Sequence, residues 1–263
     1  MKELVKKTLN ILNAPDVQFG DVRVTVTDNE NIFFERGFLK GAASEIASTS
    51  IGVRVLIGGT WGFASTSDLS SASIEKIVKE AVQNARLGAR FKNSPIEYKP
   101  VDGIVASYHF DPIKDPFKIP LKEKVSYLGE IASKMGKLDG IVHSIVHTHF
   151  YKQYKVYGNT EGTLVDTTVY DARPSMMVAA ADQNGFQTRA FPGHMPAQRG
   201  GFEVLEKLDF INNIDKIAEE AKELLTAPRV TEDQADIIIN NGHLALQLHE
   251  SVGHATEADR MFG

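Results

Sequence analysis

A cluster of prolines near the middle of the chain limits where regular structure can form. Five of the ten prolines lie between residues 95 and 120. Proline has no backbone N–H and disfavours helix in the residue before it, so this stretch predicts a connector. We expect an N-terminal α/β domain over residues 1–100, a central α/β domain over 101–227, and the start of a C-terminal domain over 228–263.

Alternating apolar residues predict half-buried strands in the first part. Asp28-Asn29 and Gly58-Gly59 have turn chemistry and would join these strands into hairpins. In the central part, short apolar runs between turn sequences predict an antiparallel meander. The predicted strands cover residues 22–26, 32–35, 51–57, 61–65, 141–151, 154–157, 164–170, 176–181 and 186–191, with a short buried strand at 237–239.

Apolar residues spaced three and four apart predict amphipathic helices, which bury one face. Ser71 is the expected N-cap of the second helix. Together these elements indicate an α+β fold: two α/β units with largely antiparallel sheets, followed by the first strand and helix of a further domain. The predicted helices cover residues 4–12, 74–85, 121–135, 214–225 and 244–252.

Composition excludes several classes of protein. With no cysteine, the 263 residues hold no Cys-ligated zinc ribbon, no iron–sulfur cluster on cysteine and no thiol nucleophile. The strongly apolar run from Met176 to Ala181 is far shorter than the roughly 20 residues of a membrane span. The net charge is −5 and no basic stripe is present, which argues against nucleic acid as a partner. The amphipathic N-terminus does not resemble a secretory signal, so we expect a cytoplasmic protein.

The last predicted helix contains the sequence His249-Glu250-Ser251-Val252-Gly253-His254. This H-E-x-x-x-H pattern is one residue longer than the familiar H-E-x-x-H zinc helix. On a regular helix, residues five apart diverge by about 140°. The two imidazoles converge on one metal only if the helix widens into a π-type turn or ends near Gly253, a residue type that tolerates unusual backbone angles. Two histidines and a glutamate also occur together by chance on a surface helix.

The motif and its surroundings resemble the TldD/PmbA metallopeptidases. Residues 249–259 are similar to the H-E-x-x-G-H-x-x-E-x-D signature of that family. Gly52-Val53-Arg54-Val55 and Trp61-Gly62-Phe63 resemble its N-terminal block, and Asn159-Thr160-Glu161-Gly162 resembles its central hairpin. The family pairs a TldD-like subunit that carries the motif with a PmbA-like (TldE) subunit that lacks it. This chain resembles the TldD side.

The resemblance implies a zinc metallopeptidase that hydrolyses peptide bonds in unfolded or extended peptides. His249 and His254 would be zinc ligands and Glu250 the general base. Glu257 and Asp259 match signature positions, either as outer partners that orient the histidine rings or as surface carboxylates. The resemblance also implies either a homodimer or a heterodimer with a PmbA/TldE-like subunit.

One departure from the family concerns the third zinc ligand, which the resemblance assigns to a cysteine of the C-terminal domain. This sequence has no cysteine and ends nine residues after His254. We therefore expect a truncated chain that is inactive alone, because catalytic zinc normally has three protein ligands. Glu257 is the alternative third ligand.

Two other interpretations remain open. The chain could be a non-catalytic peptide-binding or dimerisation module whose motif helix is a disordered stub. His147 and His149 also stand two apart on a predicted strand, a spacing that suits a metal site. A solvated or partly packed sheet face explains these strand histidines as well.

Overall fold

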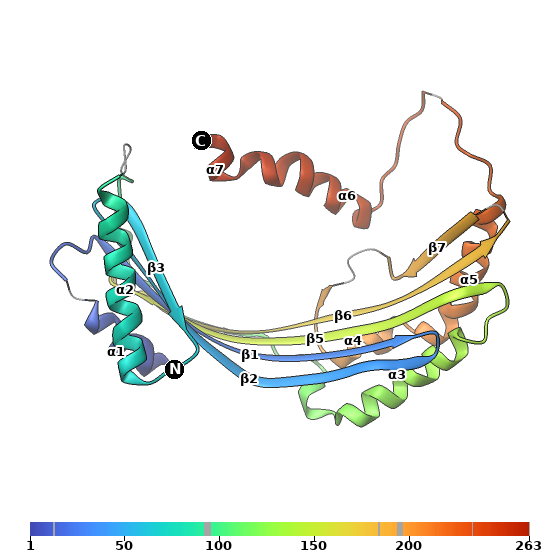
Figure 1. Cartoon of the computed structure of the whole chain (residues 1–263), viewed down its shortest axis with the longest axis horizontal. Coiled ribbons are helices and arrows are strands. Elements are labelled where there is room, and N and C mark those ends of the chain that lie inside the picture. The colour runs from blue at the N-terminus through green and yellow to red at the C-terminus, as the bar shows by residue number, and fades with distance from the viewer. Residues whose placement is uncertain (13, 92–95, 184, 194–196, 233, 263) are drawn as a thin grey trace. The chain divides into compact units, whose positions relative to one another are not determined.

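The computed structural model describes residues 1–12, 14–91, 96–183, 185–193, 197–232 and 234–262 (Figure 1). It has the expected α+β fold, with helices and a largely antiparallel sheet. The described α-helices are α1 (Lys2–Ile11), α2 (Ser71–Ala89), α3 (Leu121–Met135), α4 (Phe202–Lys207), α5 (Phe210–Thr226), α6 (Asn241–Leu248) and α7 (Ala258–Phe262).

In the described residues, the strands form one sheet in the order β3-β2-β1-β5-β6-β4, and β7 and β8 also pair with β6. The pairs β2–β3 and β6–β7 are antiparallel, whereas β4 runs parallel to β6. The strands are β1 (Phe19–Glu35), β2 (Phe38–Ile57), β3 (Thr60–Thr66), β4 (Val105–His109), β5 (Ile141–Asn159), β6 (Leu164–Asp182), β7 (Gly185–Phe191) and β8 (Gln198–Arg199).

The chain divides into two compact units, and each of the four longest strands contributes residues to both. The first unit contains residues 1–30, 44–117 and 150–171, and the second contains 31–43, 118–149 and 172–263. The domain boundaries expected from the sequence, at residues 100 and 227, stay a prediction.

The first unit buries an aliphatic core between its part of the sheet and the helices α1 and α2. Val22, Val53 and Val55 come from the strands, and Ile74 and Ala81 come from α2. Alternation along each strand places these side chains on one face. Ser70, and not the expected Ser71, caps α2, because its hydroxyl accepts a hydrogen bond from the backbone N–H of Ser73.

The second unit packs α3 and α5 together, and α5 also lies against β7. Its buried side chains include Leu128 and Ile131 of α3 and Ile214 of α5. The Phe210 ring meets Phe191 edge-on, with centroids 5.8 Å apart. The antiparallel pairing of β6 with β7, in which Asp182 is opposite Gly185, agrees with the meander predicted for the central part, while residue 184 lies outside the described residues.

Several strands are longer than the sequence pattern predicted. Asp28-Asn29 lies inside the 17-residue strand β1, so the expected turn and returning strand at 32–35 are wrong. β5 and β6 each run for 19 residues, where we expected two short strands in each case. Pro174 of β6 lies between the segment that pairs with β4 and the segment that pairs with β7, so it belongs to neither of these two ladders.

The expected strand at 237–239 is wrong, because residues 234–240 have no regular structure. Ile237 and Ile238 are 81% and 99% exposed. A strand needs a partner for its backbone groups, and none of the described strands pairs with this segment. None of the described helices is both long enough and apolar enough to cross a membrane.

Candidate metal centre

The helix that carries the H-E-x-x-x-H motif begins with a side-chain cap. The Asn240 side chain accepts a hydrogen bond of 3.1 Å from the backbone N–H of His243, so Asn240 is the N-cap of α6. The helix begins at Asn241, three residues before the expected start at residue 244. Leu248 and Val252 are about half exposed, so the motif helix is not anchored by buried apolar residues.

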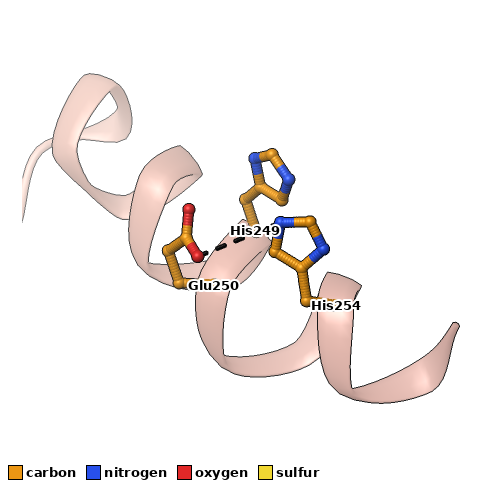
Figure 2. Close-up of side chains that lie close together, drawn as sticks. All are labelled: His249, Glu250 and His254. Atoms are coloured by element: carbon orange, nitrogen blue, oxygen red, sulfur yellow. Dashed lines mark ion pairs between the residues drawn. The ribbon is translucent and has the colours of Figure 1, made fainter. Parts of the chain in front are cut away.

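The helix widens at the motif itself. Residues His249–Gly253 form a π-helical turn, η2, in which the backbone N–H of His254 donates to the carbonyl of His249. This turn brings two residues that are five apart to the same side of the helix. The ring centroids of His249 and His254 are 4.4 Å apart, and the planes are inclined by 34° (Figure 2). Of the two arrangements that would let the imidazoles converge, a π-type turn or a helix end near Gly253, the structure has the π-type turn.

Gly253 does not use the conformational freedom of glycine. Its φ and ψ angles are −56° and −58°, which are ordinary right-handed helical values. A Cβ atom added at Gly253 would lie 3.6 Å from Cδ2 of His249, an ordinary van der Waals distance. The π-turn thus forms without a left-handed glycine.

Glu250 lies beside the two imidazoles. One ligand atom from each of His249, Glu250 and His254 lies within 4.8 Å of the others. Oε2 of Glu250 is 3.9 Å from Nε2 of His254, the ion pair marked in Figure 2. Two imidazole nitrogens and a carboxylate oxygen are donors that zinc accepts, at about 2.0–2.2 Å from the ion. Glu250 and His249 are exposed and His254 is half-buried, and this set of donor atoms suits a divalent cation.

A second carboxylate, that of Glu257, contacts the His254 ring at the nitrogen that does not face Glu250. Oε1 of Glu257 is 2.8 Å from Nδ1 of His254, and Oε2 of Glu257 is 3.4 Å from Nε of Arg260. The sequence analysis missed Arg260, although its spacing of three from Glu257 is typical of a helical ion pair. Asp259 is exposed and is not part of the three-residue group.

The histidines of β5 lie in a different environment, within the second unit. The rings of His147 and Phe33 are 6.1 Å apart, and Nε2 of His143 is 3.7 Å from Oε1 of Glu35. Burial lowers the pKa of both His147 and His149, as expected for imidazoles on a half-covered sheet face. In the described part of the chain, these histidines do not belong to a group of three metal-binding side chains.

Family models match most of the folded part of the chain. The model described as PmbA/TldA metallopeptidase domain 1 matches residues 20–85, and the PmbA/TldA metallopeptidase central domain matches 114–227. The H-E-x-x-x-H motif lies after both matched segments.

Three relatives named metalloproteases are similar to the chain. One from Methanothermobacter thermautotrophicus is 25% identical over 244 residues, which is 92% of this chain and 51% of that protein. One from Methanocaldococcus jannaschii is 22% identical and covers 97% of this chain and 54% of the relative. One from Synechocystis is 28% identical, and the match covers 80% of this chain and 44% of the relative. The chain thus spans about half the length of these relatives.

Solved structures share the fold. A putative modulator of a DNA gyrase from Thermotoga maritima superimposes with a TM-score of 0.64 at 18% identity, and the match covers 88% of this chain and 50% of that one. TldE from Thermococcus kodakarensis gives a TM-score of 0.55 at 13% identity, and the match covers 86% of this chain and 47% of TldE. With the two family matches, which together cover more than half of its residues, these findings show that the chain belongs to the PmbA/TldD metallopeptidase family.

Proposed function

We propose that this chain carries the zinc-binding motif of a metallopeptidase that hydrolyses peptide bonds in unfolded or extended peptides. The observation that carries the proposal is the π-turn, which brings His249 and His254 together with Glu250 beside them. A regular helix would separate the two imidazoles, so the wider turn gives this motif a geometry that a chance surface helix lacks.

Each side chain of the motif has a distinct role in the proposal. His249 and His254 hold the metal, and a bound zinc ion supplies the Lewis acidity that peptide hydrolysis needs. Glu250 acts as general base: its carboxylate takes a proton from the attacking water and later delivers it to the leaving amine. Its exposure leaves the carboxylate accessible to water and to substrate.

Glu257 is a positioning residue in this proposal. An ionised carboxylate only accepts hydrogen bonds, so its contact of 2.8 Å places the proton of a neutral His254 ring on Nδ1. The lone pair is then on Nε2, the atom that faces Glu250. Carboxylate partners of this kind fix the tautomer and orientation of metal-binding histidines.

The site requires a further ligand that the motif does not provide. Catalytic zinc normally has three protein ligands, and this chain has no cysteine to match the family pattern. We infer that the chain alone binds zinc weakly and that the third ligand comes from protein beyond these residues. A homodimer, or a heterodimer with a PmbA/TldE-like subunit, and a cytoplasmic location remain part of the proposal.

A cobalt titration tests the metal site directly, because Co²⁺ replaces zinc and has visible absorption. We expect weak one-to-one binding by the chain, at least tenfold weaker binding by His249→Ala, and unchanged binding by Glu250→Gln. His147→Ala is the control for the strand histidines and leaves binding unchanged. Equal binding by the wild type and His249→Ala would overturn the metal assignment.

The same titration distinguishes the alternatives for the third ligand. Tight binding by the chain alone would show a complete site, and loss of that affinity in Glu257→Gln would make Glu257 a ligand. Peptide hydrolysis is measured separately, with the chain mixed with a PmbA/TldE-like subunit and an unstructured, internally quenched peptide. Hydrolysis that is unaffected by Glu250→Gln would contradict the proposed general base.

A further inference from the structure

A groove lies on the sheet of the first unit and includes none of the residues of the H-E-x-x-x-H motif. It has a volume of about 320 Å³, at the lower end of the range for small-molecule sites. Its lining includes the side chains of Arg23, Ser50, Arg54, Phe63 and Ser65.

The strand pattern explains why these side chains share one face. Residues 21, 23 and 25 alternate along β1, and residues 50, 52 and 54 alternate along β2. In the antiparallel pair with β3, Gly52 is opposite Ser65 and Arg54 is opposite Phe63. Gly52 has no side chain, and the Phe63 ring lies over it: an added Cβ would be 3.1 Å from Cε2 of Phe63.

Arg54 is held firmly in place. Its Nε and Nη2 atoms donate to Oδ2 of Asp21 at 2.8 and 2.6 Å, and its guanidinium lies 4.4 Å from the centre of the Trp61 ring. The Asp21 side chain is only 5% exposed, whereas that of Arg54 is 43% exposed. The buried carboxylate and the indole therefore preorganise a guanidinium that still reaches solvent.

Arg23 supplies a second guanidinium without a carboxylate to balance it. The guanidinium lies 5.6 Å from the centre of the Tyr157 ring, and Arg23 forms no ion pair with any described residue. Asp21 offsets one of the two positive charges, so the groove carries about one net positive charge. Phe63 adds an apolar wall, because its ring is 58% exposed.

We propose that this groove binds the carboxylate of an N-acyl amino acid or of the C-terminal residue of a short peptide. Arg23 pairs with the carboxylate, since a planar guanidinium matches the two carboxylate oxygens. The hydroxyls of Ser50 and Ser65 offer further hydrogen bonds, and the apolar side chain of the ligand lies against Phe63. One net positive charge suits the single negative charge of a carboxylate.

The single tryptophan of the chain is a built-in reporter for this site. Trp61 is the only tryptophan, and it is in contact with Arg54. Titration with N-acetyl-L-leucine should give a saturable change in Trp61 fluorescence. N-acetyl-L-leucinamide has the same shape without the charge, and we expect it to bind at least about tenfold more weakly, because hydrogen bonds to a charged group are the stronger ones.

Variants assign the binding to Arg23. We expect Arg23→Gln to weaken binding of the acid about tenfold or more, and Arg23→Lys to retain part of the affinity because it keeps the charge. Arg229→Gln removes an exposed arginine elsewhere and should have no effect. Circular dichroism checks the fold of each variant. If Arg23→Gln fails to fold, Phe63→Ala, at an exposed position, tests the binding through the apolar wall of the groove.

Three results would overturn the proposal. The first is no saturable response to millimolar N-acetyl-L-leucine, and the second is equal binding of the acid and the amide. The third is displacement of the acid by inorganic phosphate at equal concentration, which would identify a general anion site. None of these measurements requires a metal or peptide hydrolysis, so their outcome is independent of the proposed metallopeptidase function.

Discussion

The Nδ1 atom of His254 lies 2.8 Å from a carboxylate oxygen of Glu257, three residues further along the helix. The opposite side of the same ring faces Glu250 through Nε2, at 3.9 Å. Arg260 contacts the other oxygen of Glu257 at 3.4 Å. A cation, a carboxylate and an imidazole thus follow one another on one face, and only the imidazole belongs to the H-E-x-x-x-H motif.

Glu257→Ala should change the tautomer of His254 in the metal-free chain. With the carboxylate present, the neutral ring carries its proton on Nδ1; without it, we expect a shift toward the Nε2–H form. Nitrogen-15 NMR of the imidazole distinguishes the two tautomers directly. We also expect cobalt affinity to fall by about tenfold or more, the usual cost of losing an outer partner of a metal ligand.

Asp259→Ala is the matched control, because this nearby carboxylate is exposed and lies outside the cluster. It should change neither the His254 tautomer nor the cobalt affinity. An unchanged imidazole spectrum in Glu257→Ala would show that the carboxylate does not orient the ring.

Gly253→Ala should leave metal binding intact. The backbone of Gly253 is ordinary right-handed helix, and the added methyl group would meet His249 at van der Waals distance. Alanine is favoured over glycine in a helix by about 1 kcal/mol, so the motif helix should become more stable. Circular dichroism and cobalt titration measure the two effects. A tenfold loss of cobalt affinity would show that the motif needs glycine for a reason other than backbone conformation.

The sequence predicted those parts of the fold that depend on local spacing. The apolar face of α2, with Ile74, Ile77 and Ala81, repeats at helical intervals, and Gly58 and Gly59 adopt the positive φ angles of the predicted hairpin. Strand lengths were harder to predict, because pairing with neighbouring strands overrides a local turn signal. Asp28-Asn29 is turn chemistry in isolation, yet neighbouring strands on both sides of β1 keep the chain extended.

The candidate site was predictable in part. The spacing of His249 and His254 required either a widened turn or a helix end near Gly253, and the structure has the widened turn. The exposure of Ile237 and Ile238 was not predictable, because an apolar triplet has the same pattern whether or not a partner strand is available. The groove around Arg23 and Arg54 was also missed. Gly52, Arg54 and Phe63 belong to the N-terminal block named above, but the sequence does not show that Arg23, on a third strand, joins them.

Asp166→Asn should lower stability at neutral pH. The Asp166 side chain is 5% exposed and accepts from Lys2 at 2.7 Å, from the hydroxyl of Ser107, and from His109 at 3.2 Å. The hydrogen bond from Lys2, followed by that from Ser107, lowers the pKa of Asp166 below its ordinary value of 3.8. We expect the free energy of unfolding to fall by about 1 kcal/mol, as measured by urea denaturation.

The difference in the free energy of unfolding between the wild type and Asp166→Asn should depend on pH with a defined sign. A carboxyl group with a lowered pKa in the folded state contributes stability that is fully present above its ordinary value of 3.8. This contribution is lost as the pH falls through the lowered pKa. The difference between the wild type and Asp166→Asn should therefore be constant above about pH 5 and shrink below about pH 4. A difference that grows on acidification would contradict the assignment.

Gly62→Ala should be strongly destabilising, because β3 packs against α2 at this position without space for a side chain. A Cβ at Gly62 would collide with the backbone of α2 at Ala81 and Ala85, and backbone atoms cannot rotate away. Overpacking of this kind costs on the order of 3 kcal/mol.

Gly41→Ala is the control in exposed strand, since no atom lies within 4 Å of the added Cβ. Its effect should stay within about 0.5 kcal/mol. Urea denaturation of both variants measures the contrast, and similar stabilities would show that α2 and β3 do not pack this closely.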